Sequence, residues 1–256
     1  MVILNKNFIR IGRFLGLHAL KLILLLSVII IGIINPSFRQ LANFQNILLQ
    51  SSFVGVGAAG MTLLMINGSI DLSVAGLLGL SAILLGKILP VVGTIPAIII
   101  VAISGAVLGS LNGFVVNKLR VSAFISTLGM GYIYLGLAYL WFAGKVIIIE
   151  DKRLLILGAG NVANIPIALI LMAVIYIISY CVLRFTYYGR YVRSVGSNEL
   201  ASKLIGLPIN KIRIYTFSIT GLCTAIAGIL LAGMISMANP LMATGFELNV
   251  IIIGKT

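Results

Sequence analysis

Long apolar runs, separated by short polar stretches, follow one another along the chain. Each run is close to the roughly 20 residues that an α-helix needs to cross a bilayer. The runs lack the alternation of a β-barrel strand, and an open sheet would leave backbone groups unpaired in lipid. The runs are 20–34, 51–68, 73–89, 94–116, 122–144, 165–185 and 212–237. The pattern therefore predicts an all-α, polytopic membrane protein with about seven spanning helices.

The composition agrees with this pattern. Of the 256 residues, 61% are hydrophobic and 9% are charged, whereas roughly 25% of the residues of a soluble domain are charged. The first apolar run, 20–34, lacks a small-residue cleavage site and is followed by further runs. We therefore expect it to be a retained span and not a secretory signal.

Positive charge is unevenly distributed among the predicted loops. Short cytoplasmic loops collect Lys and Arg. With a cytoplasmic N-terminus, most of the 18 Lys and Arg residues fall on the cytoplasmic side. Topology then explains the net charge of +13, with a minor contribution from attraction to anionic lipid headgroups. We expect a multi-pass membrane protein with a cytoplasmic N-terminus that does not bind nucleic acid.

Several kinds of chemistry lack the residues they need. His18 is the single histidine, so neither a histidine metal site nor a Ser-His-Asp triad can be assembled. Cys181 and Cys223 fall in predicted spans without CxxC spacing, which favours inert buried thiols. The C-terminal IIIGKT is not a Walker A motif, because Asn249 stands where that motif has its first glycine. We therefore expect no catalytic site, metal or cofactor in this chain.

The longest predicted cytoplasmic loop, 187–211, contains the signature of a short helix. Ser197 or Asn198 can cap it, Glu199 lies in its first turn, and Gly206 can end it. Its apolar face would consist of Leu200, Leu204 and Ile205. About two turns of helix are not stable alone and need a surface to dock on. That surface is either the lipid interface or a cytoplasmic partner.

One acid, Asp71, stands in an otherwise almost wholly apolar stretch between two predicted spans. An ionised Asp at the centre of a spanning helix costs about 2.5–3.5 kcal/mol, and at a turn it costs less. Asp71 or Ser73 can cap the following helix. Asp71 can also take a direct part in a solute pathway, as can Asn67 and Asn112. The residues alone leave both roles open.

Four motifs resemble those of one family of transporters. They are GMTLLMINGSIDLSV at 60–74, LNGFVVNKLRVSAFISTLGM at 111–130, YYGRYVRSVGSNELASKLIGLPINKIRI at 187–214 and ITGLCTAIAGIL at 219–230. Their order and spacing resemble those of the permease subunits of carbohydrate-type ABC importers, in the branched-chain amino acid and sugar permease family. The ribose and galactose permease group is the most similar. The resemblance runs from about residue 35 to residue 248.

The resemblance implies a single permease domain over 1–256 in the inner membrane of a bacterium. This domain would import a monosaccharide, most similar to ribose, by alternating access. ATP would be hydrolysed by separate cytoplasmic ATPase subunits, with an external sugar-binding protein and a second permease copy or paralogue as further partners. Residues 187–211 would form the coupling loop to the ATPase. Its implied contact residues are Arg190, Gly196, Asn198, Glu199, Ala201 and Gly206, with Leu200 and Ala201 where the family commonly has a double alanine.

Two further expectations concern the pathway and the C-terminus. Aromatic residues such as Tyr132, Tyr134 and Trp141 can contact a sugar, although anchoring at the membrane boundary explains them equally. The family has further spans after residue 248, so this sequence, which ends at Thr256, is expected to be short at its C-terminus. The competing function is an ion-coupled secondary transporter of a small solute, with Asp71 as its ion site.

Overall fold

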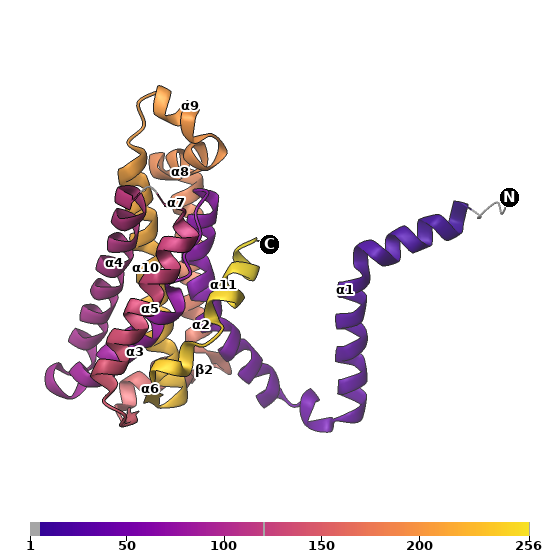
Figure 1. The fold of residues 1–256 in the computed structure, drawn as a ribbon. Coiled ribbons are helices and arrows are strands. Elements are labelled where there is room, and N and C mark those ends of the chain that lie inside the picture. The colour runs from indigo at the N-terminus through magenta and orange to yellow at the C-terminus, as the bar shows by residue number, and fades with distance from the viewer. Residues whose placement is uncertain (1–5, 120, 256) are drawn as a thin grey trace. The chain divides into compact units, whose positions relative to one another are not determined.

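The computed structural model describes residues 6–119 and 121–255 and consists mainly of helices (Figure 1). The α-helices are α1 (Lys6–Ile34), α2 (Leu41–Ile66), α3 (Val74–Val92), α4 (Thr94–Leu119), α5 (Ala123–Phe142), α6 (Lys152–Ala159), α7 (Ile167–Phe185), α8 (Tyr187–Ser197), α9 (Glu199–Leu204), α10 (Ile209–Ile235) and α11 (Phe246–Lys255). The described residues also form two 3-10 helices, η1 (Pro36–Arg39) and η2 (Pro240–Ala243). Short antiparallel pairs join β1 (Ile147–Ile148) to β4 (Met237–Ala238) and β2 (Asn161–Val162) to β3 (Ile165–Pro166).

The chain divides into two compact units, Met1–Ile47 and Leu48–Thr256. The first unit contains α1, η1 and the start of α2. Within it, the side chain of Asn35 accepts a hydrogen bond from the backbone N–H of Ser37 at 3.0 Å and begins η1. The second unit is the helical bundle that carries the candidate site.

Within the described residues, six helices are long and apolar enough to cross a membrane: α2, α3, α4, α5, α7 and α10. They coincide with six of the predicted runs and confirm the fold class. The remaining predicted run, 20–34, lies in α1, where the described apolar part is Lys21–Ile34. Helix α2 begins ten residues before the predicted run. The prediction missed its first turns because they carry the polar side chains Asn43, Gln45 and Asn46.

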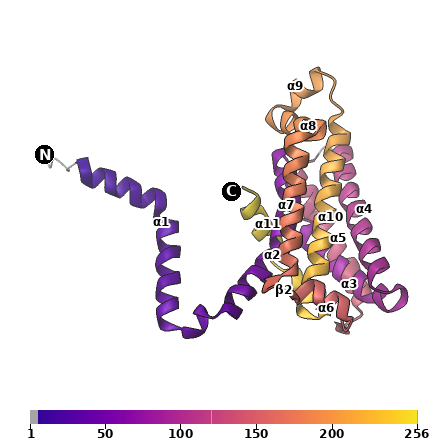
Figure 2. The same cartoon turned by 180° about the vertical axis from the view of Figure 1, so that it is seen from behind.

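The helices at the centre of the second unit are α2, α3 and α10, whereas α4, α5 and α7 expose one side (Figures 1 and 2). Helices α4 and α10 share the most extensive contact, and glycines lie along it. A Cβ atom on Gly105 would lie 2.6 Å from the carbonyl oxygen of Gly221, and one on Gly113 would lie 2.8 Å from Cα of Ile214. Close backbone contact of this kind holds helices together in lipid, where the hydrophobic effect between them is absent.

The two ends of the second unit differ in charge. We call the end that carries α8 and α9 the α9 end and the opposite end the α6 end (Figure 1). The described basic residues at the α9 end are Lys118, Arg184, Arg190, Arg193, Lys203, Lys211 and Arg213. At the α6 end, Asp151 caps α6 by accepting hydrogen bonds from the N–H groups of Arg153 and Leu154, each at 3.0 Å. The hydroxyl of Thr94 also donates to Asp151 at 2.8 Å and holds the pKa of that carboxyl below its usual range.

Candidate functional site

A cluster of buried polar side chains joins α4 and α5 to the segment between α2 and α3. One Asp71 carboxyl oxygen accepts a hydrogen bond from the N–H of Ser73 at 2.8 Å, and the other accepts one from the Asn112 amide at 3.2 Å. The same amide donates to the Ser73 hydroxyl at 2.6 Å. The hydroxyl of Tyr134 donates to the amide oxygen of Asn112 at 2.7 Å. The structure therefore brings three predicted residues, Asp71, Ser73 and Asn112, into one network.

The segment 67–73 enters the bundle and does not stay at its surface. Gly131 of α5 packs against Ser73, and the N–H of Leu72 donates to the hydroxyl of Thr127 at 2.9 Å. Asn112, the partner of Asp71, lies about two turns before the end of α4, or roughly 10 Å along its axis. Asp71 is 0% exposed. Asp71 thus lies in the predicted break between two spans, but this break is enclosed by protein.

This depth explains why Asp71 has partners. Irregular backbone at membrane depth is tolerated where it is enclosed by protein. A hydrogen bond to a charged group contributes about 1.5–3 kcal/mol, so two donors offset the roughly 2.5–3.5 kcal/mol that a buried Asp costs. The network therefore fixes the break between α2 and α3 in one conformation.

The predicted cap of α3 by the side chain of Asp71 or Ser73 is replaced by a different contact. Ser73 occupies the position before α3, but its side chain makes no cap hydrogen bond in the described structure. Asp71 accepts from the N–H of Ser73 itself, ahead of the helix. The contact resembles an Asx-turn, which orients the chain before the helix begins.

Asn67 lies apart from this network, at the α9 end. It is 2% exposed, and its amide donates to the hydroxyl of Thr216 on α10 at 3.4 Å. The same hydroxyl lies 2.9 Å from that of Tyr188 on α8. Gly196 of α8 packs directly against the carbonyl of Ile66. Asn67 therefore joins the end of α2 to α8 and α10.

The loop 187–211 contains the predicted short helix. The side chain of Asn198 accepts a hydrogen bond from the N–H of Ala201 at 2.9 Å and caps α9, whereas Ser197 ends α8. Gly206 has φ +82°, in the left-handed region that favours glycine, and follows the helix. The helix and its Asn198 cap are confirmed. Helix α8 was not predicted, because its polar residues interrupt the apolar pattern.

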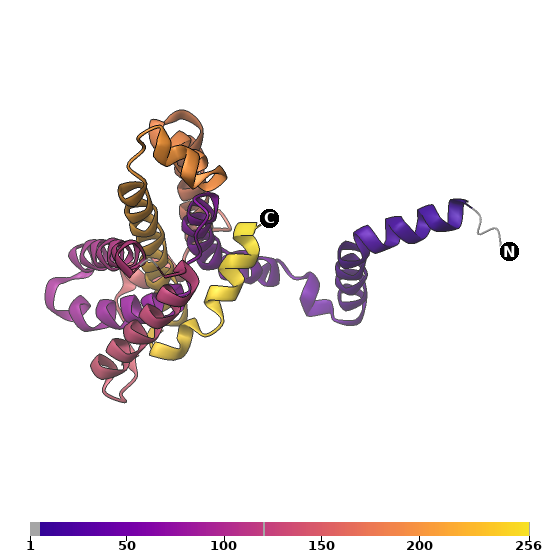
Figure 3. The same cartoon turned by 45° about the horizontal axis from the view of Figure 1, so that its top comes forward.

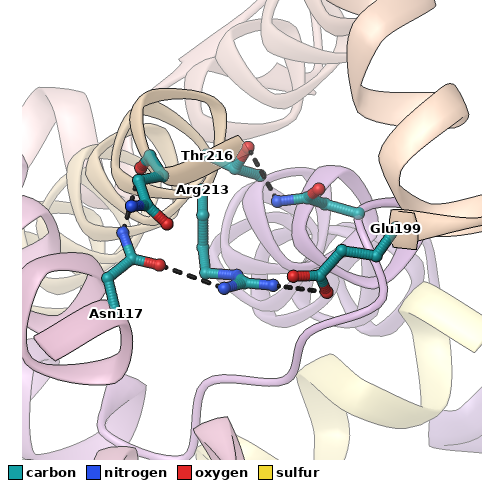
Figure 4. A network of polar contacts seen from close by, with 6 residues as sticks. Asn117, Glu199, Arg213 and Thr216 are labelled. Atoms are coloured by element: carbon teal, nitrogen blue, oxygen red, sulfur yellow. Dashed lines mark hydrogen bonds and ion pairs between the residues drawn. The ribbon is translucent and has the colours of Figure 1, made fainter. Parts of the chain in front are cut away.

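An ion pair anchors α9 to the bundle (Figure 4). The guanidinium of Arg213 on α10 lies 2.9 Å from the Glu199 carboxylate and also donates to the Asn117 side chain on α4 at 3.0 Å. On the inner side of α9, Ser202 is buried and its hydroxyl lies 3.0 Å from that of Ser194. These contacts hold α9 against α8 and α10, and Arg213 also joins α10 to α4.

The outer face of α9 is apolar and open. Leu200, Leu204 and Ile205 are 77%, 88% and 72% exposed. Arg190 is also exposed and stacks on the ring of Tyr187, with its guanidinium carbon 4.2 Å from the ring centroid. We call the surface of Leu200, Leu204 and Ile205 the α9 face.

Sequence reasoning missed several members of these networks. Tyr134 was considered for sugar contact, but it is 1% exposed and holds Asn112 instead. Thr127, Asn117 and Arg213 were not identified at all. Their signal in the sequence is weak, because each is a single polar residue whose partner is distant along the chain.

The chain matches one family of transport proteins over most of its length. The profile of the family described as "Branched-chain amino acid transport system / permease component" matches residues 43–254. The chain is 32% identical to the ribose import permease protein RbsC of Haemophilus influenzae, over 96% of this chain and 78% of that protein. It is 34% identical to RbsC of Bacillus subtilis, over 94% and 74%, and 31% identical to the L-arabinose transport system permease protein AraH of Escherichia coli K12, over 96% and 75%. No solved structure matches. The chain therefore belongs to the family of branched-chain amino acid transport system permease components and is a multi-pass protein of the bacterial cytoplasmic membrane.

Proposed function

We propose that this chain is the membrane-spanning permease subunit of an ATP-driven importer of a monosaccharide, with a ribose-like pentose as its cargo. The similar proteins are named as ribose and L-arabinose permeases. The chain itself has no catalytic role, and a separate cytoplasmic ATPase hydrolyses the ATP. The observation that carries this proposal is the α9 face, because it offers such an ATPase a rigid apolar docking surface.

The α9 face is suited to a protein partner. Helix α9 spans only Glu199–Leu204 and would not be stable alone. The Asn198 cap and the ion pair with Arg213 hold it in place. Burying one leucine side chain contributes about 1.5–3 kcal/mol. Three such side chains on a fixed helix favour docking into a groove of a partner over a passive contact with lipid.

The charge distribution supports a cytoplasmic α9 end. Lys and Arg collect on the cytoplasmic side of membrane proteins, and most of the described basic residues of the bundle lie at the α9 end. The α6 end then faces outward, where an external sugar-binding protein would deliver the cargo. A second copy of the permease, or a paralogue, would complete the pathway.

The contacts of α9 provide a route from the ATPase to the interior. A displacement of α9 reaches α10 through Arg213 and Glu199. It reaches the end of α2 through α8, because Ser202 of α9 contacts Ser194 of α8 and Gly196 of α8 packs on the carbonyl of Ile66. The next residues along the chain form the segment that contains Asp71. Closure of the ATPase subunits would thus shift the break between α2 and α3, and with it the side to which the pathway opens.

Substitution of Leu204 by aspartate tests the docking role. We expect Leu204→Asp to lower the amount of ATPase that co-purifies with the permease at least about tenfold, because the loss of a buried leucine corresponds to about 1.5–3 kcal/mol. The matched control is Leu204→Met, which keeps an apolar side chain and should retain the ATPase. Both variants should reach the membrane in normal amounts, since Leu204 is 88% exposed.

Equal recovery of the ATPase with Leu204→Asp and Leu204→Met would contradict the docking role. In that case the α9 face would be a lipid contact, and the ATPase would have to bind elsewhere on the α9 end.

A further inference from the structure

A short motif occurs twice in the chain. The sequence IDLSV at 70–74 has a counterpart, FELNV, at 246–250. The first lies in the break between α2 and α3, and the second begins α11, after the break that follows α10. Each break also has a glycine in the left-handed region shortly before the acid, Gly68 at φ +77° and Gly245 at φ +80°. The two stretches therefore agree in residue type and in the left-handed glycine that precedes each of them, although 70–73 is irregular and 246–250 is helical.

The counterpart residues also have matching environments. Val74 and Val250 are both buried in the same hydrophobic cluster, and Phe246 lies in that cluster with Ile70 packed against it. Leu72 and Leu248 line the same cavity. The acids Asp71 and Glu247 stand directly before these two leucines. The two copies of the motif therefore lie close together in the structure and pack into the same cluster and cavity.

The two copies run in opposite directions. Helix α2 ends at the α9 end, where Ile66 meets Gly196, and α3 runs to the α6 end, where Gly86 meets Ile147. Helix α10 ends at the α6 end, where Gly233 meets Gly158. Helix α11 then returns beside α5 towards the α9 end, as Figures 1 and 3 show. Inverted repeats with broken helices place solute sites at the interface between the repeats.

A cavity of about 530 Å³ lies between the two breaks and α5, and it is open on the side of Tyr132 and Leu248, which are largely exposed. It is lined by Ile70 and Leu72 from the first break, by Phe124, Tyr132 and other residues of α5, and by Glu247 and Leu248 of α11. Pockets of roughly 300–1,000 Å³ that are mostly apolar and carry a few polar groups are typical of small-molecule sites.

The two acids differ in what they bind. Both carboxyl oxygens of Asp71 accept hydrogen bonds inside the protein, and Asp71 does not line the cavity. Glu247 lines the cavity, and its Oε2 atom is buried without a hydrogen-bond partner among the described residues. Leaving such an atom unpaired costs about 1–3 kcal/mol or more, so a ligand that donates a hydrogen bond would relieve this cost.

We propose that the cavity between the two inverted breaks receives the solute, and that Glu247 accepts hydrogen bonds from its hydroxyl groups. The apolar ring faces of Phe124 and Tyr132 provide walls for the C–H faces of a monosaccharide. Asp71, its counterpart, fixes the opposite break. This inference rests on the proposed function, because it assumes that a polyhydroxylated solute crosses the chain.

Uptake of ribose and arabinose by the assembled transporter in membrane vesicles tests the role of Glu247. Glu247→Ala should lower the initial rate at limiting sugar at least about tenfold, because a hydrogen bond to a charged acceptor is lost. Glu247→Gln keeps one carbonyl acceptor and should lose less. Both variants should retain the ATPase. Uptake by Glu247→Ala at the unchanged rate would overturn the inference.

Cysteine labelling tests the cavity itself, in a chain whose Cys181 and Cys223 are replaced by alanine. Leu248→Cys, in the cavity wall, should react with a water-soluble thiol reagent, and the transported pentose should slow the reaction several-fold. Ile252→Cys lies on the same helix, is 65% exposed and does not line the cavity, so the sugar should not change its labelling. Unprotected Leu248→Cys would overturn the inference. An unaltered chain that neither retains an ATPase nor takes up either pentose would instead overturn the proposed function.

Discussion

Replacement of Asn112 by leucine should remove most of the folded protein from the membrane. Asn112 is 0% exposed, and its amide supplies the hydrogen bonds to the Asp71 carboxyl and the Ser73 hydroxyl. Leucine has a similar size but no donor, so a buried carboxyl oxygen loses its partner. We expect a loss of about 2–5 kcal/mol of stability. The yield and thermal midpoint of monodisperse protein in mild detergent measure it.

Two further variants identify the cause of this loss. Phe114→Leu changes the same helix at a side chain that is 53% exposed and should leave the thermal midpoint nearly unchanged. Combining Asp71→Asn with Asn112→Leu should recover part of the stability, because an unpaired amide is less costly to bury than an unpaired carboxylate. Normal stability of Asn112→Leu alone would show that the network does not hold the break between α2 and α3.

Adding one methyl group at Gly221 should also destabilise the protein severely. In Gly221→Ala, the new Cβ would overlap the carbonyl oxygen of Gly105 and lie 2.8 Å from Cα of Gly109. Backbone atoms cannot rotate away as a side chain can, so α4 and α10 must separate along their closest contact. Overpacking of a core typically costs about 1–3 kcal/mol and occasionally more, and we expect a loss at or above the top of that range.

Gly136 of α5 provides the matched control. A Cβ atom there would meet nothing within 4 Å among the described residues. Gly136→Ala should therefore keep the thermal midpoint or raise it slightly, because alanine favours a helix over glycine by up to about 1 kcal/mol. Equal midpoints for Gly221→Ala and Gly136→Ala would contradict the close packing of α4 and α10.

Much of the fold could be predicted because lipid imposes one requirement on every span. The apolar runs at 94–116 and 165–185 end within a few residues of α4 and α7. The pattern of apolar runs did not predict the helices that lie outside the spans, because these helices do not need to be apolar on all sides. Helix α8 and the short helix α6 lie at the ends of the bundle. Their polar residues and short lengths do not match the apolar pattern of a membrane span.

The candidate site was predictable only where its signals are local. The Asn198 cap of α9 uses residues three apart, so the sequence alone could identify it. The partner of Asp71 on α4 is 41 residues away, and Asn117 meets Arg213 across 96 residues. A pattern of hydrophobic positions does not contain such pairings. Glu247 was missed because IDLSV and FELNV share only two identical residues, so the repeat is weak until the two breaks are compared in the structure.

Affinity purification of the chain from its native membranes in mild detergent, with mass spectrometry of the proteins that accompany it, tests the central claim most directly. The proposed function predicts that a cassette ATPase is recovered with the chain in a fixed ratio. Recovery of the chain without any ATPase, from membranes in which the ATPase is present and intact, would contradict an ATP-driven importer that docks through the α9 face.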